Sequence, residues 1–290
     1  MKILRTCLCF PVWLLWVVSG ACRPEAPATA TATGAEGRDV ADGVRLIGRI
    51  ANPRLTESSG LAICAHDTNV FWTHNDGHHG VLFGFTRAGK SVAEFPVGIL
   101  LHDWEDLARD QQGHLYIGDI GNNDSKRNQL AVHQIDEPDP KESGKLLLAR
   151  KSWQLRFPNK PFDCESLFIW NDHGYVISKV FDDQHAEIYS FPLVEQKAPA
   201  VLQFVARLPI KSPATGANIS ADGKKLAVVC KSGAYVFRIK GEVERAGDAK
   251  FHYTRFRDEH IESCCFVPDG LLTTAESREI YLFTDEAFRR

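Results

Sequence analysis

Three glutamates occupy the same place in a short motif that recurs along the chain, and carboxylates grouped in this way can bind a cation. The five copies of the motif are ESSGLA from Glu57, DWEDLA from Asp103, DCESLF from Asp163, TGANIS from Thr215 and HIESCC from His260. When the copies are aligned on the residue pair that ends each one, a single position holds Ser59, Glu105, Glu165, Ala217 and Glu262. Carboxylates that lie close together raise one another's pKa, and burial raises it further. The pattern therefore predicts that the group holds either protons or a cation.

The donor atoms at this position favour a hard cation. All of them are oxygens, and Ca²⁺, before Mg²⁺, accepts oxygen ligands in a wide sphere of high coordination number. The expected protein ligands are Ser59, Glu105, Glu165 and Glu262. Water, backbone carbonyls or Asn218 would replace the side chain that Ala217 cannot supply. The alternative is that the glutamates accept hydrogen bonds from nearby backbone groups or pair with Arg and Lys.

Each motif opens a unit of short apolar strands separated by polar turns. In the first unit the later strands are VFWTH, LFGFT and SVAEFPV, whereas the last unit has LLTTA and EIYLF and lacks a fourth strand. Residues 44–50, at the other end of the body, have the pattern of that missing strand. Four-stranded units repeating roughly every 40 to 60 residues are typical of a β-propeller, whose first and last strands pair to close the ring. The sequence predicts an all-β, five-bladed propeller, because a sixth blade would need a sixth motif.

The polar loops near the glutamates are the expected ligand-binding surface. In a propeller the first strand of each blade lines the central channel, and the loops between the second and third strands share its rim. Loops held by a rigid scaffold often carry function. The loop residues expected to bind a ligand are Asn75, Asp76, Asp119, Asn122, Arg127, Lys179 and Lys231. Asp76 and Asp119 are also the candidates for orienting a water molecule in catalysis.

The composition excludes several classes of protein. The 290 residues are 44 % hydrophobic and 24 % charged, with a formal net charge of −3. These values are ordinary for a globular protein and exclude a collagen, a coiled coil or a polytopic membrane protein. Nucleic acid is not an expected partner, because binding to its phosphates needs clustered Lys and Arg. The cysteines of the body are odd in number, so at least one is unpaired in a monomer; most are expected to be buried, and no disulfide is assigned. They are Cys64, Cys164, Cys230, Cys264 and Cys265.

The N-terminal residues have the features of an export signal. Lys2 and Arg5 precede the apolar stretch FPVWLLWVV, which is short for a membrane span, and small residues lead to Cys22. We expect residues 1–21 to be a signal peptide and Cys22 to be lipidated; ordinary secretion, with cleavage after Ala21, fits the same residues. Residues 22–43 are expected to be a flexible linker, and residues 44–290 the propeller. The protein is thus expected to be exported, either lipid-anchored in a bacterial cell envelope or secreted or periplasmic, with a membrane contact only through the lipid.

The order Ser, Glu, Glu, variable, Glu around the ring resembles that of the calcium-activated nucleotidase (apyrase) family, which are secreted five-bladed propellers. The resemblance implies one Ca²⁺ in the central channel with Ser59, Glu105, Glu165 and Glu262 as ligands; the family has Ser where this chain has Ala217. The segment VFWTHNDGHHGVLFGF is similar to a family strand–turn–strand with two aspartates, and LYIGDIGNN resembles a glycine-rich loop of its second blade. The chain is more similar still to exported bacterial propellers that carry ESSGLA, DWEDLA and GDIG motifs.

Two functions follow from these features. The first is a cell-envelope propeller that binds a small molecule, a glycan or a protein partner at the face that holds the cation. The sequence contains no G-x-S-x-G, H-E-x-x-H or P-loop motif that would require catalysis. The alternative is a Ca²⁺-dependent hydrolase of phosphoanhydrides or phosphoesters, in which Arg127 and Lys179 would hold phosphate. A third option, another metal hydrolase such as a lactonase, rests on analogy of fold alone.

Overall fold

A computed structural model describes residues 37–181, 184–257 and 260–289 of the chain. The predicted signal peptide, the lipidation site at Cys22 and most of the predicted linker lie outside these residues. The chain divides into two units, residues 1–33 and residues 34–290, and the second contains every described strand. No helix in the described ranges is long and apolar enough to cross a membrane.

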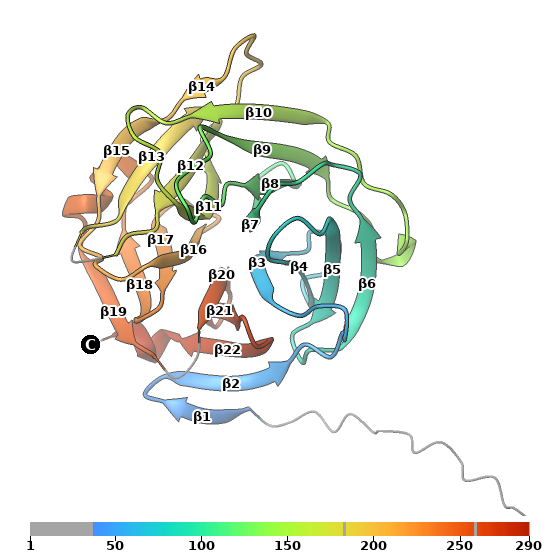
Figure 1. The fold of residues 1–290 in the computed structure, drawn as a ribbon. Coiled ribbons are helices and arrows are strands. Elements are labelled where there is room, and N and C mark those ends of the chain that lie inside the picture. Colours follow the sequence, from blue (N-terminus) through green and yellow to red (C-terminus); the bar gives the residue numbers. More distant parts are fainter. Residues whose placement is uncertain (1–36, 182–183, 258–259, 290) are drawn as a thin grey trace, which may run out of the picture. The chain divides into compact units, whose positions relative to one another are not determined.

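The described residues form 22 strands and three short 3-10 helices, η1 (Pro140–Glu142), η2 (Val243–Asp248) and η3 (Asp285–Phe288). The strands group into five sheets, which we number as blades 1 to 5 (Figure 1). Blade 1 contains β3 (Ser58–Ile63), β4 (Val70–Asn75), β5 (Val81–Thr86) and β6 (Ser91–Pro96). Blade 2 contains β7 (Trp104–Arg109), β8 (His114–Asp119), β9 (Gln129–Asp136) and β10 (Lys151–Arg156), with β14 (Ala200–Val201) parallel to β10. Blade 3 contains β11 (Cys164–Trp170), β12 (His173–Ser178), β13 (Glu187–Pro192) and β15 (Gln203–Arg207).

Blades 4 and 5 complete the ring. Blade 4 contains β16 (Ala214–Ile219), β17 (Lys225–Cys230), β18 (Gly233–Arg238) and β19 (Phe251–Arg255). Blade 5 contains β20 (Ile261–Val267), β21 (Gly270–Ala275) and β22 (Glu279–Thr284), followed outward by β2 (Val44–Arg49) and β1 (Arg38–Ala41). The innermost strands β3, β7, β11, β16 and β20 each contact the innermost strands of both neighbouring blades. The predicted all-β, five-bladed propeller is therefore confirmed.

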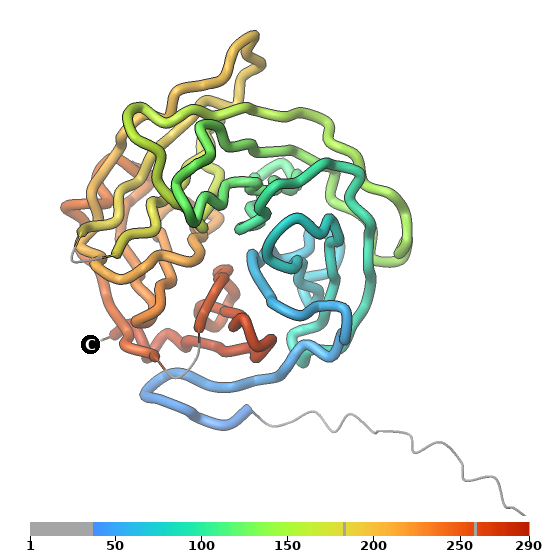
Figure 2. Tube along the Cα trace, in the orientation of Figure 1, coloured from blue at the N-terminus to red at the C-terminus, as the bar shows by residue number. Residues whose placement is uncertain are grey.

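The ring closes where the two ends of the described chain meet. Strand β2 pairs antiparallel with β22, placing Val44 opposite Phe283, as the pattern of residues 44–50 predicted. Figure 2 shows the N-terminal strands beside the C-terminal ones after the chain has passed round the ring. The domain boundary differs from the expected one, because β1 lies within residues 22–43 and pairs with β2. Its Val40 and Ala41 pack on the core between blades 4 and 5, which explains why this part of the expected linker joins the fold.

Hydrophobic side chains pack in five clusters, each between two adjacent blades. Between blades 1 and 2, Trp72 and Phe95 pack with Trp104 and Leu107, and the rings of Trp72 and Phe95 meet edge to face at 5.8 Å. Because neighbouring blades cover both faces of each sheet, β4 is buried at every position instead of alternating. The five cysteines of the body are all buried and free.

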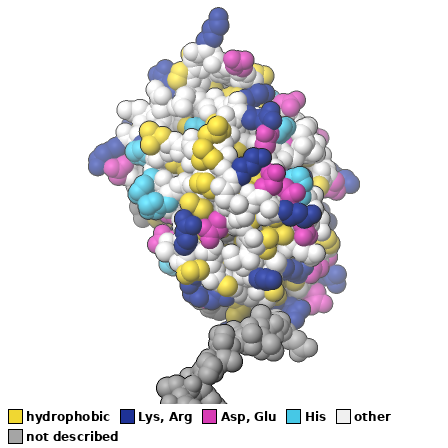
Figure 3. Space-filling view, turned by 90° about the vertical axis from the view of Figure 1, so that its right-hand side faces the viewer, with side chains coloured by type: hydrophobic (Ala, Val, Ile, Leu, Met, Phe, Trp, Pro, Cys, Tyr) yellow, Lys and Arg dark blue, Asp and Glu magenta, His cyan; other side chains and the backbone are white. Residues whose placement is uncertain are grey.

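The outer side of the propeller is mixed in character. Figure 3 shows one side of it, where Lys and Arg lie among Asp and Glu and among hydrophobic and uncharged side chains. On this face the cationic groups do not gather into one patch.

Candidate metal centre

The predicted ring position coincides with a bulge in the innermost strands. In blade 2, Trp104 pairs with Asp119 and Asp106 pairs with Gly118, so Glu105 is the extra residue. The same irregularity places Glu165 in blade 3 and Glu262 in blade 5. A bulge leaves its residue outside the regular pairing and can redirect its side chain. The three glutamates are therefore structurally equivalent, as the motif alignment predicted.

The fourth member of the ring is Thr215, not Ala217. In blade 4, Ala214 pairs with Cys230 and Gly216 with Val229, so the bulge falls at Thr215. Ala217 pairs with Val228 further along β16 and is buried in the core between blades 3 and 4. The alignment on the end of the motif was wrong here by two residues, because Ala217, and not Ile219, takes the place that Leu107 has in blade 2, opposite the residue two before the end of the second strand. Ser59-Gly60 and Thr215-Gly216 match as a hydroxyl residue followed by glycine, and this signal could have placed Thr215.

The two hydroxyl side chains of the ring bond to the backbone of the next blade. Ser59 Oγ donates to the carbonyl oxygen of Glu105 at 2.7 Å, and Thr215 Oγ1 donates to that of Ile261 at 2.5 Å. Both bonds cross from one innermost strand to its neighbour. Thr215 and Ser59 therefore link neighbouring blades through their hydroxyl groups.

Glu105 is joined by two aspartates that flank the channel mouth. Ligand atoms of Asp76, Asp103 and Glu105 all lie within 4.8 Å of one another, which is close enough for one cation to contact all three. Asp76 follows β4 and Asp103 precedes β7. Asp76 was expected at a ligand-binding loop, whereas Asp103 was not singled out, although it opens the DWEDLA motif. We call Asp76, Asp103 and Glu105 the carboxylate triad.

Glu105 is the buried member of the triad, and one of its oxygens lacks a donor among the described residues. Glu105 is 2 % exposed, and its Oε1 has no hydrogen-bond partner among the described residues. The adjacent Asp106 is equally buried but accepts bonds from the backbone N–H groups of Leu107 at 2.8 Å and Leu167 at 2.7 Å. Backbone donation, the alternative expected for the glutamates, thus applies to Asp106 and leaves Glu105 Oε1 without a donor.

The backbone at Gly121 closes one side of the triad. A Cβ atom at this position would lie 2.1 Å from Glu105 Oε1 and 2.3 Å from Asp103 Oδ2. Only glycine permits this approach, which explains the glycine in the GDIG segment. The pKa of Glu105 is raised well above its usual value by burial first, and then by the charges of Glu165, Asp76 and Asp103. Burial likewise raises the pKa of Asp76 to about 6, with a further contribution from Asp103.

Glu165 has a protein cation beside it. Lys179 Nζ donates to Glu165 Oε1 and lies 3.9 Å from Asp163 Oδ2. Burial nevertheless raises the pKa of Glu165 to about 7, against the attraction of Lys179. Its other oxygen, Oε2, has no partner among the described residues. The Lys pairing expected as an alternative to metal binding therefore holds for one oxygen of Glu165.

Glu262 lies on β20 in blade 5 and belongs to a second group. Ligand atoms of His260, Glu262 and Glu276 lie within 4.8 Å of one another, and His260 Nδ1 is 3.1 Å from Glu276 Oε2. The pKa of Glu262 is raised to about 8, by burial first and then by the charge of Glu165, against the attraction of the exposed Lys231. The structure thus divides the predicted ring, with Glu105 in the triad, Glu165 paired with Lys179, and Glu262 beside His260.

Four of the expected ligand-binding residues hold the loops together. Asn75 Oδ1 accepts from the backbone N–H of Thr56 at 2.7 Å, and Asp119 Oδ1 accepts from that of Asp103 at 2.8 Å. Arg127 Nη1 donates to Gly121 O at 2.6 Å, and its Nη2 lies 3.0 Å from Asp119 Oδ1. Asn122 Oδ1 accepts from the backbone N–H of Arg127 at 2.8 Å. Of these four, Asp119 and Arg127 bond the backbone of Asp103 and Gly121, which borders the triad.

Comparisons with known proteins add little to this geometry. No protein-family model matches the chain, and no curated protein matches it in sequence. Among solved structures, it is similar to the PQQ-bound aldose sugar dehydrogenase of Streptomyces coelicolor, at 11 % identity and a TM-score of 0.48 over 84 % of this chain and 98 % of that chain. It is also similar to hydrazine synthase of Kuenenia stuttgartiensis, at 10 % identity and a TM-score of 0.42 over 77 % and 70 %. Likenesses this weak carry no argument about the site.

Proposed function

We propose that the carboxylate triad binds a hard divalent cation, Ca²⁺ before Mg²⁺, and that the propeller uses this face to bind a small molecule, a glycan or a protein. The observation that carries the proposal is the buried Glu105, whose Oε1 lacks a hydrogen-bond partner among the described residues and faces Asp76 and Asp103 within 4.8 Å. An unpaired buried carboxylate is strongly unfavourable unless a proton or a cation neutralises it. The all-oxygen donor set fits Ca²⁺.

Three carboxylates leave much of a Ca²⁺ sphere open. The ion takes six to eight oxygen ligands, so water and the oxygens of a bound molecule would complete it. After burial, the charge of Glu165 is the strongest influence that raises the pKa of Glu105. A face of this kind suits a ligand that presents its own oxygen atoms to the ion.

Binding is a better fit than hydrolysis of phosphoanhydrides or phosphoesters. The hydrolase alternative needs Arg127 and Lys179 as phosphate donors, but the Arg127 guanidinium bonds Gly121 and Asp119, and Lys179 bonds Glu165. Of the two aspartates expected to orient water, Asp119 bonds Arg127 and the Asp103 backbone, which leaves Asp76. The donors that would recognise phosphate are thus already engaged within the protein.

The experiment that tests the cation site measures bound metal and thermal unfolding of the full chain in Ca²⁺ and in EDTA. One Ca²⁺ per chain and a stabilisation of about 2.7 kcal/mol at one hundred times the Kd are expected. Glu105→Gln should abolish the shift, whereas Glu94→Gln, a matched change at an outer-strand residue paired with Arg54, should retain it. An unchanged shift in Glu105→Gln would contradict the proposal.

We further propose that the protein is exported and anchored through Cys22. The charged start, short apolar stretch and small residues before Cys22 support this, as does the Ala- and Thr-rich segment that follows. Fractionation of a bacterial host that expresses the full chain provides the test. The chain should be found with membranes and Cys22→Ala should not; equal membrane association of both would contradict lipidation.

A further inference from the structure

An apolar loop leads directly to the carboxylate triad. Residues 97–101 have the sequence VGILL and connect the end of β6 to the segment that carries Asp103. Val97 and Leu101 are buried in the core between blades 1 and 2, which holds the loop in place. Leu100, between them, is 98 % exposed, so its side chain projects into the solvent.

A second segment adds two leucines to the same place. Residues 144–148 run parallel to the end of β6 and are joined to it by a backbone hydrogen bond from Gly98 at 2.7 Å (Figure 1). Leu146 and Leu148 are 55 % and 61 % exposed, and both lie within 3.5 Å of where a Cβ atom on Gly98 would be. A single exposed leucine is common, whereas several that adjoin one another indicate a contact surface. We call Leu100, Leu146 and Leu148 the leucine group.

The leucine group is close to the triad. Leu100 precedes Asp103 by three positions, and three residues of extended chain span no more than about 11 Å. The loop that follows Asp76 is also joined to this segment, because residues 77–80 and residues 97–104 form backbone hydrogen bonds of 2.8 Å at each end. A surface that contacts the leucines can therefore also reach a cation on the triad.

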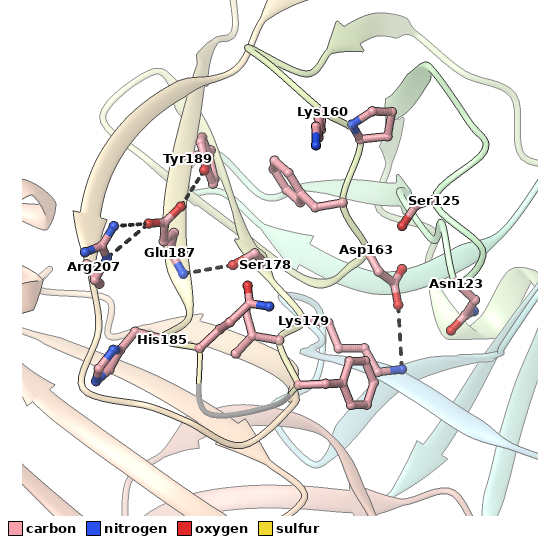
Figure 4. Close-up of a pocket in the computed structure, with 15 residues that line it drawn as sticks. Asn123, Ser125, Lys160, Asp163, Ser178, Lys179, His185, Glu187, Tyr189 and Arg207 are labelled. Carbon is pink, nitrogen blue, oxygen red and sulfur yellow. Dashed lines mark hydrogen bonds and ion pairs between the residues drawn. The ribbon is translucent and has the colours of Figure 1, made fainter.

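The carboxylates on the blade 3 side of the mouth already have a protein cation. Lys179 lies 3.9 Å from Asp163 Oδ2, as Figure 4 shows, and it also bonds Glu165. In contrast, no cationic side chain of the described residues forms an ion pair with a member of the triad. Without an ion, the triad would repel anionic groups; with one, the free coordination positions accept phosphate oxygens.

We propose that this face docks onto a phospholipid bilayer when the cation is bound, with the leucine group among the acyl chains and lipid phosphate oxygens on the ion. Docking adds a partner to the proposed function and rests on it in one respect: the ion must occupy the triad.

A bilayer fits both features of this face, because it presents phosphate groups above an apolar layer. Apolar side chains that enter the headgroup boundary, together with an electrostatic contact, give reversible binding. The proposed lipid on Cys22 would keep the face near a membrane, since the 14 residues 23–36 span no more than about 50 Å even when fully extended. Docking would thus add to the lipid contact expected from the sequence.

The test uses the full chain with Cys22→Ala, which removes the lipid, and vesicles of phosphatidylethanolamine and phosphatidylglycerol. Co-sedimentation should show binding at least tenfold tighter in Ca²⁺ than in EDTA, and EDTA should release the bound chain, so that fractionation in EDTA still reports the lipid alone. Leu100→Ala and Leu148→Ala should each weaken the Ca²⁺-dependent binding about tenfold, since each removes most of one buried leucine side chain. Both should keep the melting shift that Ca²⁺ gives the parent. Val194→Ala, the matched control in the β13–β14 connection, is 56 % exposed and should bind as the parent does.

The outcomes separate docking from the cation site. A Ca²⁺ melting shift with vesicle binding that is equal in Ca²⁺ and EDTA would overturn docking and leave the triad in place. Absence of the melting shift would overturn the proposed cation site and docking together. Parent-like binding by both leucine variants would overturn the role of the leucine group, and equal binding to vesicles of a phosphate-free glycolipid would overturn phosphate ligation. Ca²⁺-dependent self-association without vesicle binding would overturn docking in favour of a second copy of this chain.

Discussion

Ser59 Oγ donates a 2.7 Å hydrogen bond to the carbonyl oxygen of Glu105, so the hydroxyl of one blade fixes the backbone that carries the buried glutamate of the next. Both residues are buried. The bond therefore determines where Glu105 sits relative to Asp103 and Asp76. The Ser59 hydroxyl thus acts on the carboxylate triad through the backbone of Glu105, and not through the Glu105 side chain.

Ser59→Ala should destabilise the protein by about 1 kcal/mol, because a buried interblade hydrogen bond is lost and the Glu105 carbonyl is left with fewer donors. Thermal unfolding in EDTA measures this. Thr215→Val is the matched change in blade 4 and should have a similar effect on stability. Ca²⁺ affinity should fall less than tenfold in both variants. A much larger loss of affinity in Ser59→Ala alone would indicate that Ser59 ligates the ion directly, as the sequence predicted.

Stability without metal should depend on pH through Glu165 and Glu262. Burial raises their pKa values to about 7 and about 8, above the usual value of 4.5, so the folded protein binds these protons more tightly than the unfolded chain does. The free energy of unfolding in EDTA should therefore fall as pH rises from about 4.5 through about 8. Because Ca²⁺ binds the ionised carboxylates, its stabilising effect should be larger at pH 8 than at pH 5. Chemical denaturation at several pH values measures both trends.

Glu262→Gln provides the control for that pH dependence. The amide cannot ionise, so the variant should be more stable than the parent at pH 8 by about 1–3 kcal/mol in EDTA and similar to it at pH 5. A parent-like fall in stability between pH 5 and pH 8 would show that Glu262 does not carry the raised pKa.

Arg127→Ala should destabilise the fold, because the guanidinium bonds both Gly121 O and the Asp119 carboxylate. Among the described contacts, no other side chain bonds either group. A loss of about 2–3 kcal/mol is expected, since Asp119 would keep a buried charge without its partner. Lys126→Ala, on the same loop but paired only at the surface with Asp124, should change stability by less than about 0.5 kcal/mol. Urea denaturation compares them. Equal stability of Arg127→Ala and the parent would favour the ligand-binding role expected from the sequence.

Gly121→Ala should damage the cation site directly. The added Cβ would lie 2.1 Å from Glu105 Oε1, so the carboxylates or the GDIG loop must move. Ca²⁺ affinity should fall at least tenfold, and stability in EDTA should fall by about 1–3 kcal/mol. Gly98→Ala is a suitable control, because its Cβ would meet only the ends of the flexible Leu148 and Leu146 side chains. Parent-like Ca²⁺ affinity in Gly121→Ala would place the ion elsewhere.

The sequence predicted the architecture well because the blade is a repeated local pattern. Alternating strands and turns recur in each unit, and the strand over residues 44–50 completes the last blade by the same pattern. The equivalence of Glu105, Glu165 and Glu262 followed from that repetition. Thr215 was missed because the residue pair on which blade 4 was aligned, Ile219-Ser220, lies two residues further along its strand than Leu107-Ala108 does in blade 2, and the hydrophobic pattern alone does not reveal this shift.

The internal partners of the site were harder to predict. Arg127 and Lys179 are polar loop residues in the sequence, and only the folded loops show that Arg127 bonds Gly121 while Lys179 bonds Glu165. Asp103 joins Asp76 and Glu105 because the loops after β4 and before β7 approach each other, through the backbone bonds between Gly77 and Trp104. Contacts between neighbouring blades of this kind depend on the closed ring and are absent from any single repeat.

Asp76→Asn should separate metal binding from folding. Asp76 follows β4 at the edge of the triad, where desolvation raises its pKa, so an uncharged amide of the same size should leave stability in EDTA equal to that of the parent or slightly higher. Removal of one of three carboxylates from the triad should weaken Ca²⁺ binding about 10- to 100-fold, because a charged ligand becomes neutral. Asp124→Asn, an exposed aspartate on the β8–β9 loop, should keep parent affinity and is the matched control. Titration with Ca²⁺, followed by the shift in melting temperature, measures both variants. Full Ca²⁺ affinity in Asp76→Asn would mean that the ion is held without Asp76, and the ring of Glu105, Glu165 and Glu262 would then be the stronger candidate for its ligands.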